Sequence, residues 1–166
     1  MTTTFKGEPI MLAGQFLKPG DSAPEFYLVK NDLTEFTLKD AKGHYLIMNI
    51  FPSLDTGVCA TTVRRFNKMA AALPGACVLC ISKDLPFAQN RFCTTEGLDF
   101  VIPLSDFRYT SRFGQDYGVL MTSGPLRGLL ARAVIIINPE GKVVYSELVN
   151  EVTHEPNYDT ALKAVK

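Results

Sequence analysis

The sequence predicts an α/β fold in which a mixed central sheet is flanked by helices. Residues 45–51 and 133–137 are almost entirely apolar, which is typical of strands buried on both faces of a sheet. Extended and helical patterns alternate along the rest of the chain. The 166 residues, 46% of them hydrophobic, suffice for one compact domain. Because no Pro/Gly/Ser-rich linker divides the chain, we expect a single domain over residues 1–166.

The first half of the chain begins with a predicted N-terminal β-hairpin. Residues 4–18 contain two short extended segments around Gly7-Glu8-Pro9, and turn residues follow at 19–24. In segment 58–73 the apolar residues recur at steps of four and three, the spacing of one face of an amphipathic helix. The other elements expected in this half are strands at 25–29, 35–38 and 45–51.

The second half continues the alternation and ends in two adjacent strands. Pro86 stands near the first position of a second helical stretch, which Glu96-Gly97 closes. A turn at 139–141 joins the last two strands. The elements expected here are strands at 77–82, 100–104, 131–138 and 143–149 and helices at 86–96, 111–117 and 158–165. This order fits a thioredoxin-like core.

Composition excludes several classes of function. Seventeen Lys+Arg balance seventeen Asp+Glu, so no net basic field favours nucleic acid or an anionic membrane. No apolar run approaches the roughly 18 residues of a membrane span. The N-terminus shows no secretory signal, although a mature chain could have lost one, so we expect a cytoplasmic protein. Four cysteines are too few for a disulfide scaffold and are core residues, metal ligands or redox groups.

Cys59 lies near the start of the predicted helix, where Asp55 or Thr56 is the natural N-cap. Its position also matches the apolar stripe of that helix, so a reactive thiol and a core residue are about equally supported. A thiol with a pKa of about 8.5 needs roughly 3.4 kcal/mol to reach a pKa near 6. A helix terminus supplies at best about 2 kcal/mol. A reactive Cys59 therefore requires a cation folded against it.

Arg132 is the best candidate for that cation. It stands at or near the start of the strand at 131–138, where an unpaired guanidinium would be costly. The alternative is that its head group reaches solvent at the strand end. Arg64 and Arg65 are closer in sequence but are typical of a solvated helix face.

Thr56 occupies the position three residues before Cys59, where its hydroxyl can cap the helix and also donate to the sulfur.

The other cysteines differ in position. Cys77 and Cys80 stand three apart on a predicted strand and so point to opposite faces; we assign both to the core and expect no four-cysteine zinc site. Cys93 ends a partly polar stretch, so we expect it to be accessible and able to pair with Cys59. A bridge between these two residues, 34 positions apart, would restrict the unfolded chain by roughly 3–4 kcal/mol.

Two other functions compete with redox chemistry. A cysteine hydrolase needs a histidine base beside Cys59, whereas His44 and His154 are both expected at the surface. A non-catalytic binding protein of the same fold would use Cys59 and Arg132 only for packing. Such a protein has no use for a second thiol able to reach the first, so Cys93 discriminates between these readings.

The string FPSLDTGVC at residues 51–59 resembles the peroxiredoxin signature, and specifically that of the bacterial thiol peroxidases, the atypical two-cysteine branch. The resemblance continues through DLPFAQ and RFC at residues 84–93, through residues 124–134 and into the N-terminal hairpin, and so covers nearly the whole chain. Cys77 departs from the family pattern.

The resemblance implies a function and its residues. Cys59 would be the peroxidatic thiolate, oxidised to a sulfenic acid by hydrogen peroxide or alkyl hydroperoxides, and Cys93 would resolve it as a disulfide within one subunit. Thr56 and Arg132 would hold the thiolate and peroxide oxygens, while Pro52 would shield the sulfur from water. Such a site needs no metal, haem or flavin. The family implies thioredoxin as reductant, a homodimer and an antioxidant role.

Overall fold

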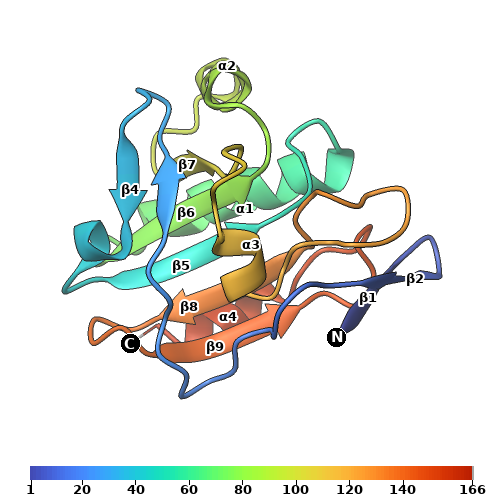
Figure 1. Cartoon of the computed structure of the whole chain (residues 1–166). Coiled ribbons are helices and arrows are strands. Elements are labelled where there is room, and N and C mark those ends of the chain that lie inside the picture. The colour runs from blue at the N-terminus through green and yellow to red at the C-terminus, as the bar shows by residue number, and fades with distance from the viewer. Residues whose placement is uncertain (166) are drawn as a thin grey trace.

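The computed structural model describes residues 1–165 and is built around a seven-stranded mixed sheet (Figure 1). The strand order is β4-β3-β7-β6-β5-β8-β9. These strands are β3 (Tyr27–Val29), β4 (Glu35–Thr37), β5 (Tyr45–Ile50), β6 (Ala76–Ser82), β7 (Ile102–Ser105), β8 (Ala133–Ile137) and β9 (Val143–Leu148). A separate antiparallel pair, β1 (Thr2–Phe5) and β2 (Glu8–Met11), forms the predicted hairpin. No helix within residues 1–165 is long and apolar enough to cross a membrane.

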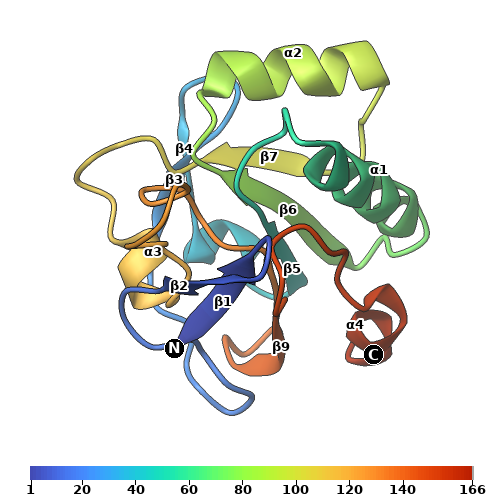
Figure 2. The ribbon, with the colours of Figure 1, turned by 90° about the vertical axis from the view of Figure 1, so that its right-hand side faces the viewer.

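Helices cover both faces of the sheet. They are the 3₁₀ helix η1 (Leu38–Ala41) and the α-helices α1 (Gly57–Ala71), α2 (Pro86–Glu96), α3 (Phe113–Asp116) and α4 (Tyr158–Lys163). In Figure 2, α1 and α4 lie on one side of the sheet and α3 on the other. Two buried apolar clusters correspond to these sides, one containing Phe66 of α1 and Tyr158 of α4, the other containing Phe113 of α3. The predicted α/β, thioredoxin-like class is confirmed.

The central strand β5 determines where the functional residues meet. It runs parallel to β6 and antiparallel to β8, with Ile50 opposite both Ile81 and Ala133. The loop that follows β5 leads into α1, the segment that follows β6 leads into α2, and Arg132 directly precedes β8. The first residues of the two cysteine-bearing helices and the buried arginine therefore lie together, at the end of the sheet where β5 and β6 end and β8 begins.

The observed elements agree with the predictions in type and differ at their ends. The sequence analysis misses η1, a single turn held by a capping interaction between Thr37 and Asp40. The predicted strand at 131–138 is shorter in the structure, where β8 covers Ala133–Ile137 and the Ala131 N–H donates to the Val119 carbonyl instead. The extended segments predicted within residues 4–18 pair earlier, at residues 2–11.

Candidate active site

Cys59 is the third residue of α1 and is fully buried. Thr56 is the N-cap, and its Oγ1 accepts a hydrogen bond of 3.3 Å from the backbone N–H of Cys59. The Cys59 sulfur also belongs to the apolar cluster that contains Val63 and Phe66. The two features weighed from the sequence thus coexist: the thiol is packed like a core residue and lies at the positive end of a helix dipole.

Arg132 is folded against this sulfur. Its Nη2 lies 3.1 Å from the Cys59 Sγ, and its Nε donates a 2.8 Å hydrogen bond to the carbonyl of Val152. Arg132 as a whole is 1% exposed, so its head group does not reach solvent at the strand end. Its Nη1 has no hydrogen-bond partner among residues 1–165. An orphaned buried donor is costly, which makes this nitrogen a ready donor for an added oxygen.

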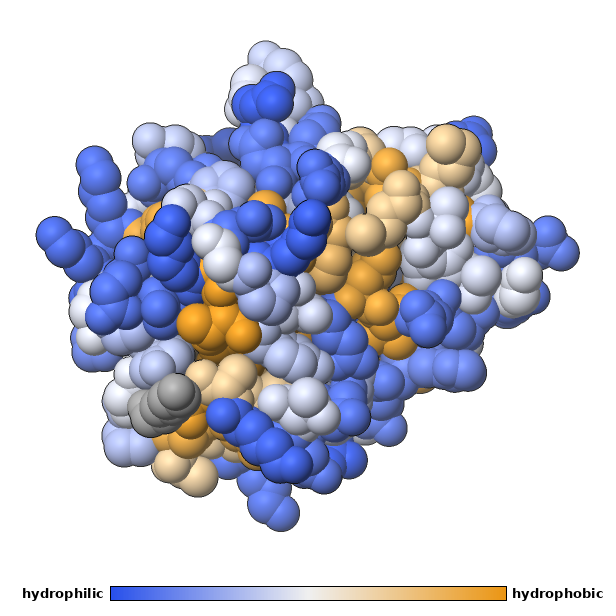
Figure 3. Space-filling model, turned by 90° about the horizontal axis from the view of Figure 1, so that it is seen from below, coloured by the Kyte–Doolittle hydropathy of each residue, from blue (hydrophilic) through white to orange (hydrophobic). Residues whose placement is uncertain are grey.

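A cavity of about 190 Å³ is lined by Arg132, whose Nη2 contacts the Cys59 sulfur; Cys59 itself is not among the lining residues. The exposed lining is almost wholly apolar and comes from the hairpin, the loop before α1 with the first turn of that helix, the segment before β8 and the segment after β9. It includes Phe5, Pro52, Leu126, Leu129 and Val152, with Thr56 and Arg132 among its polar residues. Figure 3 shows an apolar area exposed on the side of the molecule where the hairpin lies in Figure 1. Such a cavity suits a small ligand with one polar end and an apolar remainder.

Glu151 fastens the hairpin next to this cavity. Its carboxylate accepts hydrogen bonds from Thr4 Oγ1, from the backbone N–H groups of Lys6 and Gly7 and from Thr153 Oγ1. The Thr4 hydroxyl, followed by the other donors, lowers the pKa of Glu151 to about 2. The hairpin that carries Phe5 is therefore held by the residue adjacent to Val152, the partner of the buried arginine.

Asp84 joins the two thiol-bearing regions, and the sequence analysis missed this role. Its carboxylate accepts hydrogen bonds from Ser53 Oγ and from the Leu54 N–H, each at 2.8 Å, and from Ser82 Oγ at 2.7 Å. The loop before α1 is thus fixed to the end of β6, two residues before α2 begins at Pro86. The sequence feature that could have indicated this role is the position of Asp84, an acidic residue between a buried strand and the proline that begins a helix.

Cys93 lies on α2 and is buried, with 9% exposure, so the prediction that it is accessible was wrong. Gln89 and Cys93 stand one helical turn apart and both face the protein interior, which the weak amphipathicity of this segment concealed. Burial, followed by the charge of Asp99, raises the pKa of the Cys93 thiol to about 11. Cys59 and Cys93 share one apolar cluster and are not bonded.

The other sulfur and imidazole groups occupy the expected positions. Cys80 is buried on the α1 side of β6, while the partly buried Cys77 packs on the opposite side, which confirms that the two point to different faces. Burial raises the pKa of Cys80 to about 12. His44 and His154 are exposed. Within residues 1–165, no group of three or more His, Cys, Asp or Glu side chains could hold a metal ion.

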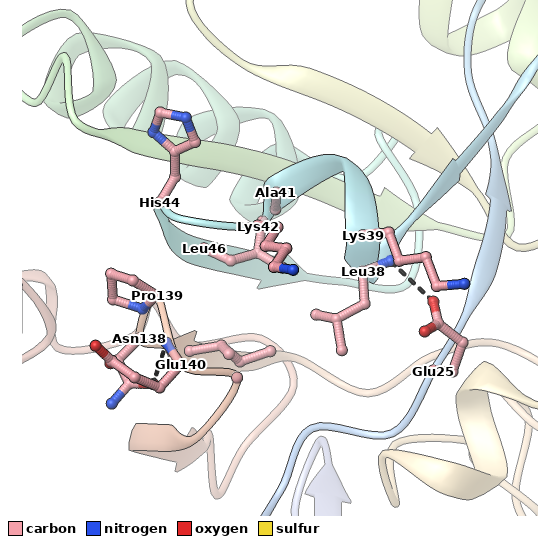
Figure 4. Close-up of a pocket in the computed structure, with 12 residues that line it drawn as sticks. Glu25, Leu38, Lys39, Ala41, Lys42, His44, Leu46, Asn138, Pro139 and Glu140 are labelled. Atoms are coloured by element: carbon pink, nitrogen blue, oxygen red, sulfur yellow. Dashed lines mark hydrogen bonds between the residues drawn. The ribbon is translucent and has the colours of Figure 1, made fainter.

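A second hollow, of about 290 Å³, lies at the opposite end of β5 (Figure 4). Lys39, Lys42 and His44 rim it, with Leu46 and Pro139 nearby. No cysteine lines this hollow, and none of its lining residues is recorded in contact with a cysteine sulfur. The smaller cavity also has no cysteine in its lining, but it is lined by Arg132, whose guanidinium contacts the Cys59 sulfur. The cavity beside Arg132 is therefore the candidate active site.

Comparisons with known proteins agree with this geometry. The Redoxin family model matches residues 18–162. A thiol peroxidase of Corynebacterium glutamicum is 52% identical over 98% of each chain, and one of Mycobacterium bovis is 50% identical over 98% of this chain and 96% of that protein. The crystal structure of a peroxiredoxin-like protein from Aquifex aeolicus superposes with a TM-score of 0.92 at 48% identity, covering 98% of this chain and 94% of that one. The thiol peroxidase from Chromobacterium violaceum gives a TM-score of 0.87 at 25% identity, with the same coverage. The chain therefore belongs to the redoxin family and, within it, to the peroxiredoxin-type thiol peroxidases.

Proposed function

We propose that the protein reduces hydrogen peroxide and alkyl hydroperoxides to water or alcohols, with Cys59 as the attacking thiolate and Cys93 as the resolving thiol. The observation that carries this proposal is the unpaired Nη1 of Arg132, buried beside the sulfur at the edge of an apolar cavity. One guanidinium can thereby hold an anionic sulfur with Nη2 and a peroxide oxygen with Nη1.

The first step transfers one oxygen. The Cys59 sulfur attacks the terminal peroxide oxygen, the S–O bond forms, the O–O bond breaks, and the leaving alkoxide or hydroxide takes a proton to become alcohol or water. Negative charge moves from the sulfur toward the leaving oxygen, beside the same guanidinium. Thr56 lines the cavity, and its hydroxyl donates to the Ser53 carbonyl at 3.3 Å, so it would have to turn from that carbonyl to bind a peroxide oxygen. Pro52, which is buried against the cavity, keeps water from the sulfur.

The second step forms a disulfide within one subunit. The Cys93 sulfur attacks the sulfenic sulfur of Cys59, hydroxide leaves as water, and the cysteine pair is oxidised by two electrons in total. A dithiol of the thioredoxin type then restores both thiols by exchange. The shared apolar cluster of Cys59 and Cys93 supports the pairing, although Cys93 must leave its buried position on α2.

We also propose a homodimer, a cytoplasmic location and an antioxidant role. Support for a dimer comes from large apolar side chains exposed after β6 and β7, among them Phe87 at 65% and Tyr109 at 99%. Four unpaired thiols fit a reducing compartment. Sedimentation at micromolar concentration tests the dimer.

A thiol count tests the chemistry. One equivalent of hydrogen peroxide added to the reduced protein should remove two of the four thiols, and peptide mapping should assign them to Cys59 and Cys93. Cys59→Ser should abolish peroxide consumption, whereas the matched variant Cys80→Ser, on the same side of the sheet, should retain it. Unchanged thiols would remove the enzymatic proposal; a stable sulfinic acid without a disulfide would remove the role of Cys93.

A further inference from the structure

The two halves of α2 are held to the protein in different ways. At its first turns the buried Gln89 donates from Nε2 to the Leu104 carbonyl at 2.8 Å and to Ser82 Oγ at 3.2 Å. Pro86 is also buried. These interior contacts fix the beginning of α2 to the ends of β6 and β7.

The last turns of α2 pack against α1 through Cys93 and Phe92, which contact the apolar cluster of α1, and their polar attachment to α1 is an arginine at the surface. Arg64 Nε lies 2.8 Å from Glu96 Oε2, and its Nη2 lies 2.9 Å from Oε1, which makes a two-pronged ion pair. The Arg64 guanidinium also lies 6.0 Å from the ring centre of Phe92. Both contacts flank Cys93, which stands one residue after Phe92 and three before Glu96.

Glu96 is an unfavourable residue for its position. It is the last residue of α2, where the helix dipole is negative and a carboxylate is destabilising, and the last turn contains no basic residue of its own. Arg64 supplies the missing positive charge from the neighbouring helix and lowers the pKa of Glu96 through its hydrogen bonds. Without Arg64, an uncompensated acid would remain at the end of the segment that carries Cys93.

We propose that Arg64 is a positioning residue for disulfide formation: it holds the C-terminal half of α2 closed, and Cys93 reaches Cys59 when the pair between Arg64 and Glu96 opens. This inference rests on the proposed function. The segment after Gln89 moves while the first turns of α2 remain anchored. The exposed Cys93 then loses its proton to solvent, its sulfur bonds to the sulfenic sulfur of Cys59, and hydroxide leaves as water.

Arg64→Gln tests the proposal, because glutamine keeps good helix propensity while removing the ion pair. Without the ion pair the C-terminal half of α2 opens more often, so disulfide formation should be faster. Because exposed ion pairs contribute little to stability, we expect an increase of about two- to fivefold. Arg65→Gln is the matched control: it removes the same charge one residue away, from a side chain that lies over Tyr158 on α4. This control should form the disulfide at the parental rate.

The chain contains no tryptophan, so the two steps are better separated by rapid acid quenching and alkylation, followed by mass spectrometry, than by intrinsic fluorescence. Sulfenic acid formation depends on peroxide concentration; disulfide formation does not.

The dependence of the rate on salt concentration is a second measurement. At 1 M ionic strength screening acts within about 3 Å, so the parental rate of disulfide formation should rise toward that of Arg64→Gln, which should change little.

A double variant separates two effects of Arg64→Gln: the loss of the ion pair, and the uncompensated charge of Glu96 at the negative end of α2. Arg64→Gln/Glu96→Gln lacks the acid at the negative helix end, so its rate should fall between those of Arg64→Gln and the parent. Equal or slower disulfide formation in Arg64→Gln, or a salt response shared equally by Arg64→Gln and the parent, overturns the inference. Failure of the parent to form any disulfide instead refutes the proposed function.

Discussion

Arg132→Met removes the cation beside Cys59 and leaves an apolar side chain of comparable length. In the parent, the guanidinium is buried, touches the sulfur at 3.1 Å and donates to the Val152 carbonyl at 2.8 Å. Methionine keeps much of the packing and provides neither donor. We expect peroxide reduction to fall far more than stability does.

The contact distance gives the expected size of the loss. At 3.1 Å and an effective dielectric constant of about 20, a guanidinium and a thiolate attract by roughly 5 kcal/mol before desolvation is subtracted. Removal of one preorganised donor from an anionic transition state costs about 2.7–4 kcal/mol, or a factor of 10² to 10³ in rate. Replacement of a buried ionic group by an apolar one changes stability far less, because the buried charge no longer has to be desolvated.

The assay combines two measurements on the same preparation. The second-order rate constant for hydrogen peroxide should fall by about 10² to 10³, while the midpoint of thermal unfolding should change by only a few degrees. Arg127→Met is a matched control, since Arg127 is exposed and its Nη1 donates a 3.4 Å hydrogen bond to the Gly124 carbonyl. A parental rate in Arg132→Met, or a rate loss fully explained by unfolded protein, would refute the reasoning.

Three further changes probe the surroundings of the site. Thr56→Val removes the N-cap acceptor of α1 and should destabilise the fold by about 1 kcal/mol, measured by denaturant unfolding; an unchanged midpoint would contradict the capping role. Phe5→Ala enlarges the apolar cavity and should lower the rate constant for cumene hydroperoxide several-fold relative to hydrogen peroxide; parallel losses would show that Phe5 acts only on stability. Glu151→Gln should lower the unfolding midpoint most at pH 7: the folded pKa, about 2, lies below the ordinary 4.5, so the contribution of Glu151 is present above pH 4.5 and lost as the pH falls toward 2. A difference from the parent that grows below pH 4.5 would reverse this sign.

The fold was largely predictable because its signals are local or periodic. The apolar run around β5 predicts a central strand, and Pro86 and Gly97 delimit α2 as expected, with Gly97 in the left-handed conformation of a helix C-cap. The 3₁₀ helix η1 escaped prediction because one short turn carries little periodicity. The start of the strand predicted at 131–138 depended on a long-range contact, from the Ala131 N–H to the Val119 carbonyl, that no local pattern contains.

The sequence predicted site residues only where burying that residue type without a partner would cost free energy. An arginine at the start of a strand buried on both faces needs an anionic partner, and this argument led to the observed contact between Arg132 and Cys59. Glu151 gave no such signal because its donors from Thr4, Lys6 and Gly7 are contributed by a distant segment. The accessibility of Cys93 was misjudged because polar neighbours on the outer face of α2 conceal the buried face.

On the proposed mechanism, burial restrains the resolving thiol in two ways. The Cys93 side chain lies in the interior cluster, and burial raises its pKa to about 11, so at pH 7 it is far less ionised than a solvated thiol with a pKa of about 8.5. Exposure of Cys93 therefore supplies its reactivity, and Arg64 adjusts how often exposure occurs. In the closed state the second thiol does not compete with Cys59 for peroxide.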